Sequence, residues 1–261
     1  MLVGRSHKFK TAITRLPSIS VVQGLRDGGG PDPSAENFMQ QHGAYVAALK
    51  ASGARVLELP ALEEFPDSVF VEDSALCLKE AAIVLRPGAP SRFGEAALIR
   101  PALESQFSKV LDLPGDGFLD GGDVLLSDED AFIGLSARTN QAGFDALATI
   151  LATFGYSPVK IETLASILHF KTECGLLDSK TIFSTENLAS IGCFENYQVI
   201  LTPEGEEGAA NIVRFNDNVL VSQGYPKSEA LLKSHGYNVV VIDTSEPAKI
   251  DGGLSCMSLR F

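Results

Sequence analysis

The sequence predicts an α/β protein built from five ββαβ-like units that pack around a central axis. Helical periodicity recurs along the chain, beginning near residues 35, 94, 140, 187 and 227, and a short strand pattern follows each helix. One or two further short strands lie between successive helix–strand pairs. This repeating order of elements predicts repeated units rather than one large open sheet.

The first helix shows the signals on which these assignments depend. Asp32-Pro33-Ser34 leads into residues 35–52, Phe38, Tyr45 and Leu49 share one face, and Gly53 ends the helix. The other helices are expected at 94–106, 140–154, 187–191 and 227–234. The strands that follow the helices are expected at 55–59, 110–113, 158–161, 198–201 and 238–243. The strands between the units are expected at 69–71, 75–78, 82–86, 124–126, 131–135, 181–184 and 219–222.

Two short segments resemble each other directly. Leu119-Asp120-Gly121-Gly122 matches Ile250-Asp251-Gly252-Gly253, and each follows a helix–strand pair. Asp-Gly turns are common, so chance is one explanation. Their shared place in the unit favours a true repeat.

Composition and charge exclude several classes of protein. Apolar residues make up 45% of the chain and charged residues 21%, as in ordinary globular proteins. With 33 acidic and 21 basic residues the net charge is −12, and no Lys/Arg cluster is present. Binding to nucleic acid or to an anionic membrane surface is therefore not expected, whereas small cations are natural ligands. Apolar runs are far shorter than a membrane helix, and the first residues lack a signal-peptide pattern. We therefore expect a cytoplasmic protein.

No linker or low-complexity segment divides the chain, so residues 1–261 are expected to form one domain. Four cysteines, without any CxxC pair, are expected to be free thiols. Glycines between Gly24 and Gly30, followed by two prolines, predict a mobile loop or lid. The sequence leaves a monomer and a homodimer equally open.

Packing around an axis would bring the segments after the helix–strand pairs together at one end. These segments are residues 65–73, 118–123, 168–175, 205–211 and 249–256. They contain Cys256, His169 and Asp120, which suit a nucleophile, a general acid/base and a group that orients the base. Cys256 alone is more typical of a packed cysteine in a last strand, and His169 alone of a core or turn residue. Their predicted convergence is what favours catalysis.

Carboxylates gather in the first of these segments. Asp67, Glu72 and Asp73 flank an apolar stretch and could equally be a solvated loop. Buried carboxylates need a partner, and a planar guanidinium suits a pair of them through bidentate hydrogen bonds. Arg92 and Arg138, otherwise surface arginines, could hold a carboxylate at the other end of the ligand. A cationic α-amino acid would satisfy both sets.

These motifs carry a resemblance over essentially the whole chain. FPDSVFVED, RPGAPSRFGE, the LDGGD turn, GLSARTN, LHFKT and IDGGLSCMSLRF are similar to the dimethylarginine dimethylaminohydrolase family of the guanidine-modifying (amidinotransferase) superfamily. The resemblance implies a five-bladed α/β propeller of ββαβ repeats. It also implies hydrolysis of Nω-methylated arginines to citrulline and a methylamine, without metal or organic cofactor.

The resemblance also implies roles for individual residues. Cys256 is then the nucleophile, His169 the general acid/base and Asp120 its orienting group, at a position where some relatives have glutamate. The remaining residues implied to contact the substrate are Glu72, Asp73 and Asp67 at the guanidinium, Arg92 and Arg138 at the α-carboxylate, the carbonyls of Leu25 and Ile250 at the α-amino group, and Asp251 beside the nucleophile.

Two other functions stay open at this point. The first is another reaction on the same scaffold, such as arginine deimination or amidino transfer, although deiminases are typically longer and carry an inserted helical module that this chain lacks. The second is a catalytically silent binder of cationic amino acids, which the set Cys256, His169 and Asp120 disfavours.

Overall fold

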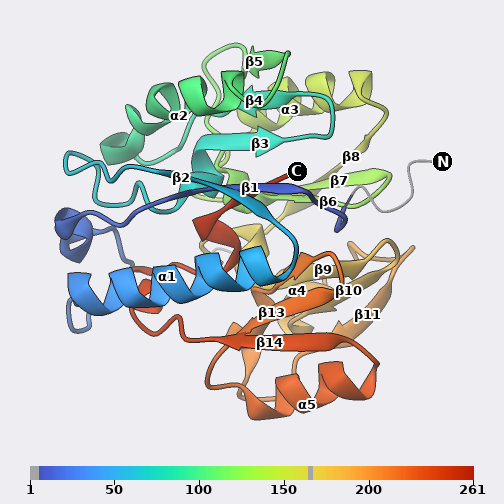
Figure 1. Cartoon of the computed structure of the whole chain (residues 1–261). Coiled ribbons are helices and arrows are strands. Elements are labelled where there is room, and N and C mark those ends of the chain that lie inside the picture. Colours follow the sequence, from blue (N-terminus) through green and yellow to red (C-terminus); the bar gives the residue numbers. More distant parts are fainter. Residues whose placement is uncertain (1–5, 164–166) are drawn as a thin grey trace.

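The computed structural model describes residues 6–163 and 167–261. Within these residues the strands form five three-stranded sheets, arranged as blades around an axis with the helices on the outside (Figure 1). The five-bladed α/β propeller that the resemblance implies is therefore confirmed. None of the described helices is both long and apolar enough to cross a membrane.

All blades share one strand order. A first strand pairs antiparallel with a central strand, which pairs in parallel with a third strand after a helical crossover. The first strands are β3 (Ala75–Cys77), β6 (Val124–Leu126), β9 (Cys174–Asp178), β12 (Val213–Phe215) and β15 (Leu259–Arg260). The central strands are β4 (Ala82–Val84), β7 (Asp130–Leu135), β10 (Thr181–Ser184), β13 (Asn218–Ser222) and β1 (Thr11–Arg15). The third strands are β5 (Val110–Asp112), β8 (Ser157–Glu162), β11 (Gln198–Leu201), β14 (Asn238–Ile242) and β2 (Arg55–Leu59).

The crossover helices lie close to their predicted positions. They are α1 (Ala35–Ala51), α2 (Glu95–Glu104), α3 (Gln141–Thr153), α4 (Glu186–Ala189) and α5 (Pro226–Ser234). Ser34 caps α1 by accepting a hydrogen bond from the N–H of Asn37, as the Asp-Pro-Ser lead-in indicated.

The ring closes through the two ends of the chain. In the first blade β15 pairs with β1, so that Ile13 lies opposite Leu259. Apolar clusters then fill the space between neighbouring blades. Ile13 and Leu259, for example, pack with Val71, Ile99 and Leu103 of the next blade. Because each blade buries its faces against its neighbours, none has a core of its own.

A short 3-10 turn precedes each first strand, and these five turns are called the axial turns below. They are η2 (Val71–Ser74), η4 (Gly121–Asp123), η5 (Phe170–Thr172), η6 (Glu207–Ala210) and η8 (Ser255–Met257). Turn η2 contacts η8 and η4, and η5 contacts η4 and η6. The segments that the sequence placed at one end of the axis therefore do converge.

Two predictions about local structure were wrong, and strands β1, β9, β12 and β15 were not predicted. Residues 69–71 are not a strand. Val69 and Phe70 directly precede turn η2, and their apolar side chains are buried at the axis of the propeller and not in a sheet. The two Asp-Gly-Gly segments are not equivalent in the blades. Asp120 directly precedes axial turn η4, whereas Asp251 follows η7 (Pro247–Ile250) in a left-handed conformation, before η8 begins.

We expect the closing strand to stabilise the whole ring. Leu259→Ala should lower the free energy of unfolding by about 2–5 kcal/mol, because it leaves a void between two blades. Leu201→Ala, at an exposed position of β11, should change it by less than about 0.5 kcal/mol. Urea unfolding measures both. Equal losses would show that β15 is not part of the cooperative core.

Candidate active site

The axial turns place the predicted catalytic residues around one point. Asp120 and His169 are each the residue directly before an axial turn, at η4 and η5. Asp73 lies within η2, and Cys256 lies within η8. Four blades thus contribute to the site, as the predicted convergence required.

A small cavity of about 30 Å³ lies at this point. Nine predicted site residues line it: Leu25, Asp67, Asp73, Arg92, Arg138, His169, Ile250, Asp251 and Cys256. Phe70, Leu168 and Gly252 complete the wall. The volume is sufficient for about one water molecule. An arginine-sized ligand therefore requires the wall to move.

Asp120 orients His169 through a hydrogen bond to its imidazole ring. The Oδ2 atom of the fully buried Asp120 lies 2.9 Å from Nε2 of His169, and its Oδ1 atom accepts the N–H of Gly88 at 2.7 Å. The aspartate arm is thus long enough for the contact. A Cβ at Gly122 would lie 2.9 Å from the imidazole ring, so glycine allows the turn to pack against that ring.

Carboxylates surround the imidazole and change its proton affinity. Burial lowers the pKa of His169, but Asp73, the hydrogen bond with Asp120, and the charges of Asp123 and Asp120 together raise it to about 9. His169 is therefore an imidazolium at neutral pH. It can give a proton to a leaving group.

The environment of Cys256 favours the neutral thiol. Burial and the charges of Glu72 and Asp73 raise the pKa of Cys256 to about 12, against the opposing effects of the Gly253 N–H and of Lys171. Without a ligand the sulfur is thus protonated at neutral pH. A cation in the small cavity would compensate Asp73, which lines it, and so lower the pKa of the thiol.

The guanidinium of Arg92 uses most of its N–H groups in hydrogen bonds with other residues of the protein. Its Nη1 atom lies 2.5 Å from Oδ2 of Asp73, and its Nε and Nη2 atoms contact the carboxylate of Glu95. Nη2 also donates to the carbonyl of Phe70. Arg92 therefore orients Asp73, and its second Nη1 hydrogen has no hydrogen-bond partner among the described residues. Glu95 was not among the predicted residues, although its place at the end of the RPGAPSRFGE motif was a signal that could have been used.

Glu72 faces away from the small cavity. Its carboxylate lies 2.6 Å from Nζ of Lys171 and 2.9 Å from Nη2 of Arg260, and it accepts a 3.0 Å hydrogen bond from the hydroxyl of Ser255. The structure thus separates the predicted pair, because consecutive residues of turn η2 point to opposite sides of the ring. The carboxylate of Asp73 lines the small cavity, and that of Glu72 does not.

Arg138 is the less engaged of the two predicted arginines. It lines the cavity, is partly exposed and has no ion pair among the described residues. Its guanidinium is thus available to an anionic group of a ligand.

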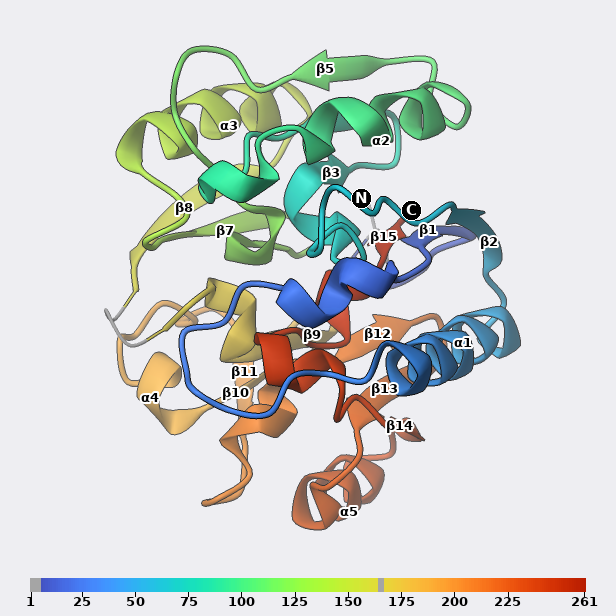
Figure 2. The same cartoon turned by 90° about the vertical axis from the view of Figure 1, so that its left-hand side faces the viewer.

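The lid closes the cavity through main-chain hydrogen bonds. The N–H of Leu25 donates to Asp67, and the N–H of Asp27 donates to Asp251. Burial raises the pKa of Asp67. In Figure 2 the blue segment before α1 loops around the red C-terminal turns. Few contacts hold this segment, so it can open without disturbing the blades.

A further buried carboxylate supports the site and was not predicted. Asp123 accepts hydrogen bonds from the hydroxyls of Ser136 and Thr139 at 2.7 and 2.6 Å, and from the N–H of Phe170 at 2.9 Å. Burial raises its pKa. Asp123 thus ties the segment that carries His169 to the neighbouring blade. Its place in the LDGGD motif was a signal that could have been used.

Asp73, Asp120 and His169 could in principle hold a metal ion, since one ligand atom of each lies within 4.8 Å of the others. These atoms already have partners, however. Asp73 is paired with Arg92, and the imidazole Nε2 faces Asp120. The donors present thus form a proton-transfer network, and a metal ion would have to displace Arg92.

Comparison with known proteins agrees with this geometry. Residues 31–202 match the family of eukaryotic N,N dimethylarginine dimethylhydrolases. The N(G),N(G)-dimethylarginine dimethylaminohydrolase of Pseudomonas aeruginosa is 38% identical over 97% of this chain and 100% of its own length. A structure of that enzyme, a cysteine-to-serine variant complexed with citrulline, superimposes with a TM-score of 0.94 over 97% of this chain and 100% of the other.

An amidinotransferase from Microseira wollei shares the fold at 16% identity, with a TM-score of 0.82 over 98% of this chain and 95% of the other. This likeness concerns the fold alone. Because the nearer relatives match over their full length at more than 30% identity, the chain belongs to the dimethylarginine dimethylaminohydrolase family of hydrolases, which act on C–N bonds.

Proposed function

We propose that the protein hydrolyses Nω-methylated arginines, asymmetric dimethylarginine and monomethylarginine, to L-citrulline and dimethylamine or methylamine. The observation that carries this proposal is the convergence of Cys256, His169 and Asp73 on one small cavity. The citrulline complex of the Pseudomonas relative supports it. We further propose that residues 1–261 act as a single catalytic domain.

The site offers a place for each part of such a substrate. Asp73 and Asp67 face the guanidinium, and Arg138 with the remaining Nη1 hydrogen of Arg92 binds the α-carboxylate. The carbonyls of Leu25 and Ile250 accept the α-amino group. Glu72 acts from the opposite side and holds Ser255, the neighbour of the nucleophile.

The reaction then proceeds in two steps. Binding of the guanidinium lowers the thiol pKa, the thiol proton passes to solvent water because His169 is already protonated, and the Cys256 thiolate attacks the guanidinium carbon. A C–S bond forms, and the C–N bond breaks as His169 protonates the departing amine through Nδ1, since Nε2 faces Asp120. Neutral His169 next takes a proton from water. The hydroxide attacks the same carbon, the C–S bond breaks, and citrulline leaves.

The nucleophile assignment predicts a specific pattern of losses. Cys256→Ser should reduce citrulline formation by roughly 10³-fold or more, because a hydroxyl is a much weaker nucleophile. His169→Gly should reduce it roughly 10²–10⁴-fold and should accumulate a Cys256 adduct, because hydrolysis lacks its base. A citrulline assay and mass spectrometry of rapidly quenched reactions measure these effects. Cys193→Ser is the control and should retain full activity. Normal turnover in Cys256→Ser would eliminate the assignment.

The raised thiol pKa predicts the pH dependence of alkylation. With a thiol pKa of about 12, the thiolate fraction rises about tenfold for each pH unit from 7 to 10, and inactivation by neutral 2-chloroacetamide should follow it. The cationic isostere 2-chloroacetamidine should react at least about tenfold faster at pH 7, since it brings a compensating charge. Cys256→Ser should be inert to both. An inflection below about pH 6 for the neutral reagent would mean that the thiolate is preformed.

The two arginines should differ in their effect on specificity. Arg138→Ala should cost about 2–4 kcal/mol, roughly 30- to 1000-fold in kcat/KM, for monomethylarginine but less than about threefold for methylguanidine, which has no carboxylate. Arg92→Ala should impair both substrates, because Asp73 loses its partner. Exposed Arg100→Ala is the control. Equal losses for both substrates in Arg138→Ala would refute the carboxylate assignment.

A further inference from the structure

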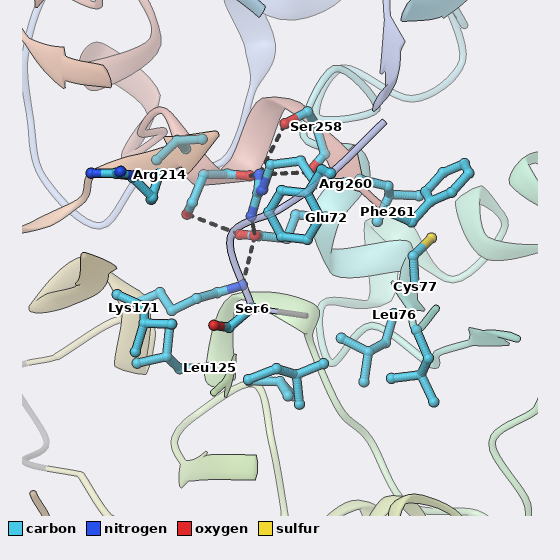
Figure 3. A pocket seen from close by; sticks show the side chains of 18 of the residues that line it. Ser6, Glu72, Leu76, Cys77, Leu125, Lys171, Arg214, Ser258, Arg260 and Phe261 are labelled. Carbon is cyan, nitrogen blue, oxygen red and sulfur yellow. Dashed lines mark hydrogen bonds and ion pairs between the residues drawn. The ribbon is translucent and has the colours of Figure 1, made fainter. Parts of the chain in front are cut away.

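The axial turns also line a second and much larger cavity, to which Glu72 and Ser255 belong, whereas their neighbours Asp73 and Cys256 line the small one (Figure 3). The larger cavity has a volume of about 520 Å³, within the usual range of small-molecule sites. All five first strands β3, β6, β9, β12 and β15 contribute to its wall. It is therefore an axial cavity of the propeller, and the proposed mechanism does not use it.

The axial cavity has the opposite charge balance to the whole chain. Acidic residues outnumber basic ones by 33 to 21 overall. In the cavity wall, by contrast, six side chains are basic and Glu72 is the acidic one among the described residues: Lys8, Lys10, Lys79, Lys171, Arg214 and Arg260. This reversal produces a local positive potential in a chain that otherwise repels anions.

The floor of the cavity holds more positive than negative charge. Lys171 and Arg260 share the single carboxylate of Glu72, at 2.6 and 2.9 Å. Lys171 and Glu72 are almost fully buried. Arg260 also donates from Nη1 to the carbonyls of Ser255 and Ser258, which disperses part of its charge. Two cations on one carboxylate still leave one net positive charge at the floor, so an anion in the cavity would be favoured.

Further basic side chains lie at the rim of the cavity, and they differ in how far neighbouring groups compensate their positive charge. Lys10 and Lys79 are exposed and have no ion pair among the described residues. Lys8 pairs with Asp217, and Arg214 donates to a main-chain carbonyl and lies over the ring of Tyr237. The charges of Asp178 and Asp217 also reach Arg214. The uncompensated rim charge therefore comes from the two lysines.

The rest of the wall is largely apolar. Between floor and rim it consists mainly of aliphatic and aromatic side chains, among them Leu76, Leu125, Leu176, Ile212 and Leu259. Strongly hydrated polyanions do not suit such a wall. One anionic group on an apolar body of about ten to twenty heavy atoms suits both wall and volume.

The floor is connected to the catalytic cysteine. Glu72 accepts the hydroxyl of Ser255, and Asn211 bridges that hydroxyl to the main chain of Lys171. Cys256 follows Ser255 directly and faces the small cavity. The charges of Glu72 and Lys171 act on its sulfur in opposite directions.

We propose that the axial cavity is a second ligand site, which binds a small amphipathic anion (a carboxylate or sulfonate on an apolar body) and thereby slows the reaction of Cys256. The anion is held by Lys171 and Arg260 at the floor and attracted by Lys10 and Lys79 at the rim. Its charge adds to that of Glu72 on one side of the sulfur, and the thiolate becomes harder to form.

The binding test uses the fluorescent sulfonate 8-anilinonaphthalene-1-sulfonate as probe. We expect one probe to bind per chain, and its affinity to fall at least fivefold in the double variant Lys10→Glu/Lys79→Glu. The control is the double variant Lys50→Glu/Lys233→Glu, which changes the net charge by the same amount at exposed helix positions. Its affinity for the probe should change by less than twofold. Binding of the neutral analogue N-phenyl-1-naphthylamine should be the same in both variants. Several probes per chain, or equal weakening by both double variants, would overturn the site.

The coupling test measures alkylation of Cys256 by 2-chloroacetamide at pH 8, with and without saturating probe. We expect the rate to fall about threefold in the wild type, and an unchanged rate would overturn the coupling. Monomethylarginine should not displace the probe from Cys256→Ser, and displacement would place the probe in the small cavity. None of these readouts requires turnover, so their failure is distinguishable from failure of the proposed hydrolysis.

Discussion

The need to compensate buried carboxylates at the axis determines how the blades are joined. Each of these groups lies out of contact with bulk water, and each has donors from another part of the ring. Asp120 takes the N–H of Gly88 and the imidazole of His169, and Asp123 takes the N–H of Phe170. Glu72 takes Lys171 and Arg260. The same hydrogen bonds that satisfy the charges therefore fix the blades in register, and a catalytic geometry results from a structural requirement.

The repeat pattern was predictable, because each blade carries its own local signals. Helix caps, glycine ends and short apolar strands depend on near neighbours, so five helices lie where the sequence placed them. The error at residues 69–71 has a different origin. Val69, Phe70 and Val71 are as apolar as a strand, but they are buried at the axis, where η2 begins. Apolar content alone does not distinguish a strand from a buried turn.

The sequence could not show which of the two cavities a residue of an axial turn faces. In the axial turns, neighbours point to different cavities: Glu72 and Ser255 line the large one, whereas Asp73 and Cys256 line the small one. A 3-10 turn has no simple alternation that the sequence reveals. Glu72 and Asp73 were therefore predicted to bind the ligand as a pair, although each lines a different cavity. Lys171 was not predicted as a site residue for the same reason. The sequence does not show that it lines the large cavity, whereas His169, two residues earlier, lines the small one.

This two-sided arrangement explains how the site can hold so much negative charge before a substrate arrives. Glu72 is neutralised from the large cavity by Lys171 and Arg260, and Asp73 is neutralised within the wall by Arg92. Burial together with the charges of Glu72 and Asp73 still keeps Cys256 a thiol, and the carboxylates of Asp73, Asp120 and Asp123 hold His169 as an imidazolium with a pKa of about 9. In the proposed mechanism, placing the partners of Glu72 in the large cavity leaves the small cavity to the guanidinium. The charge that activates the sulfur would then be the one that also carries the reacting carbon.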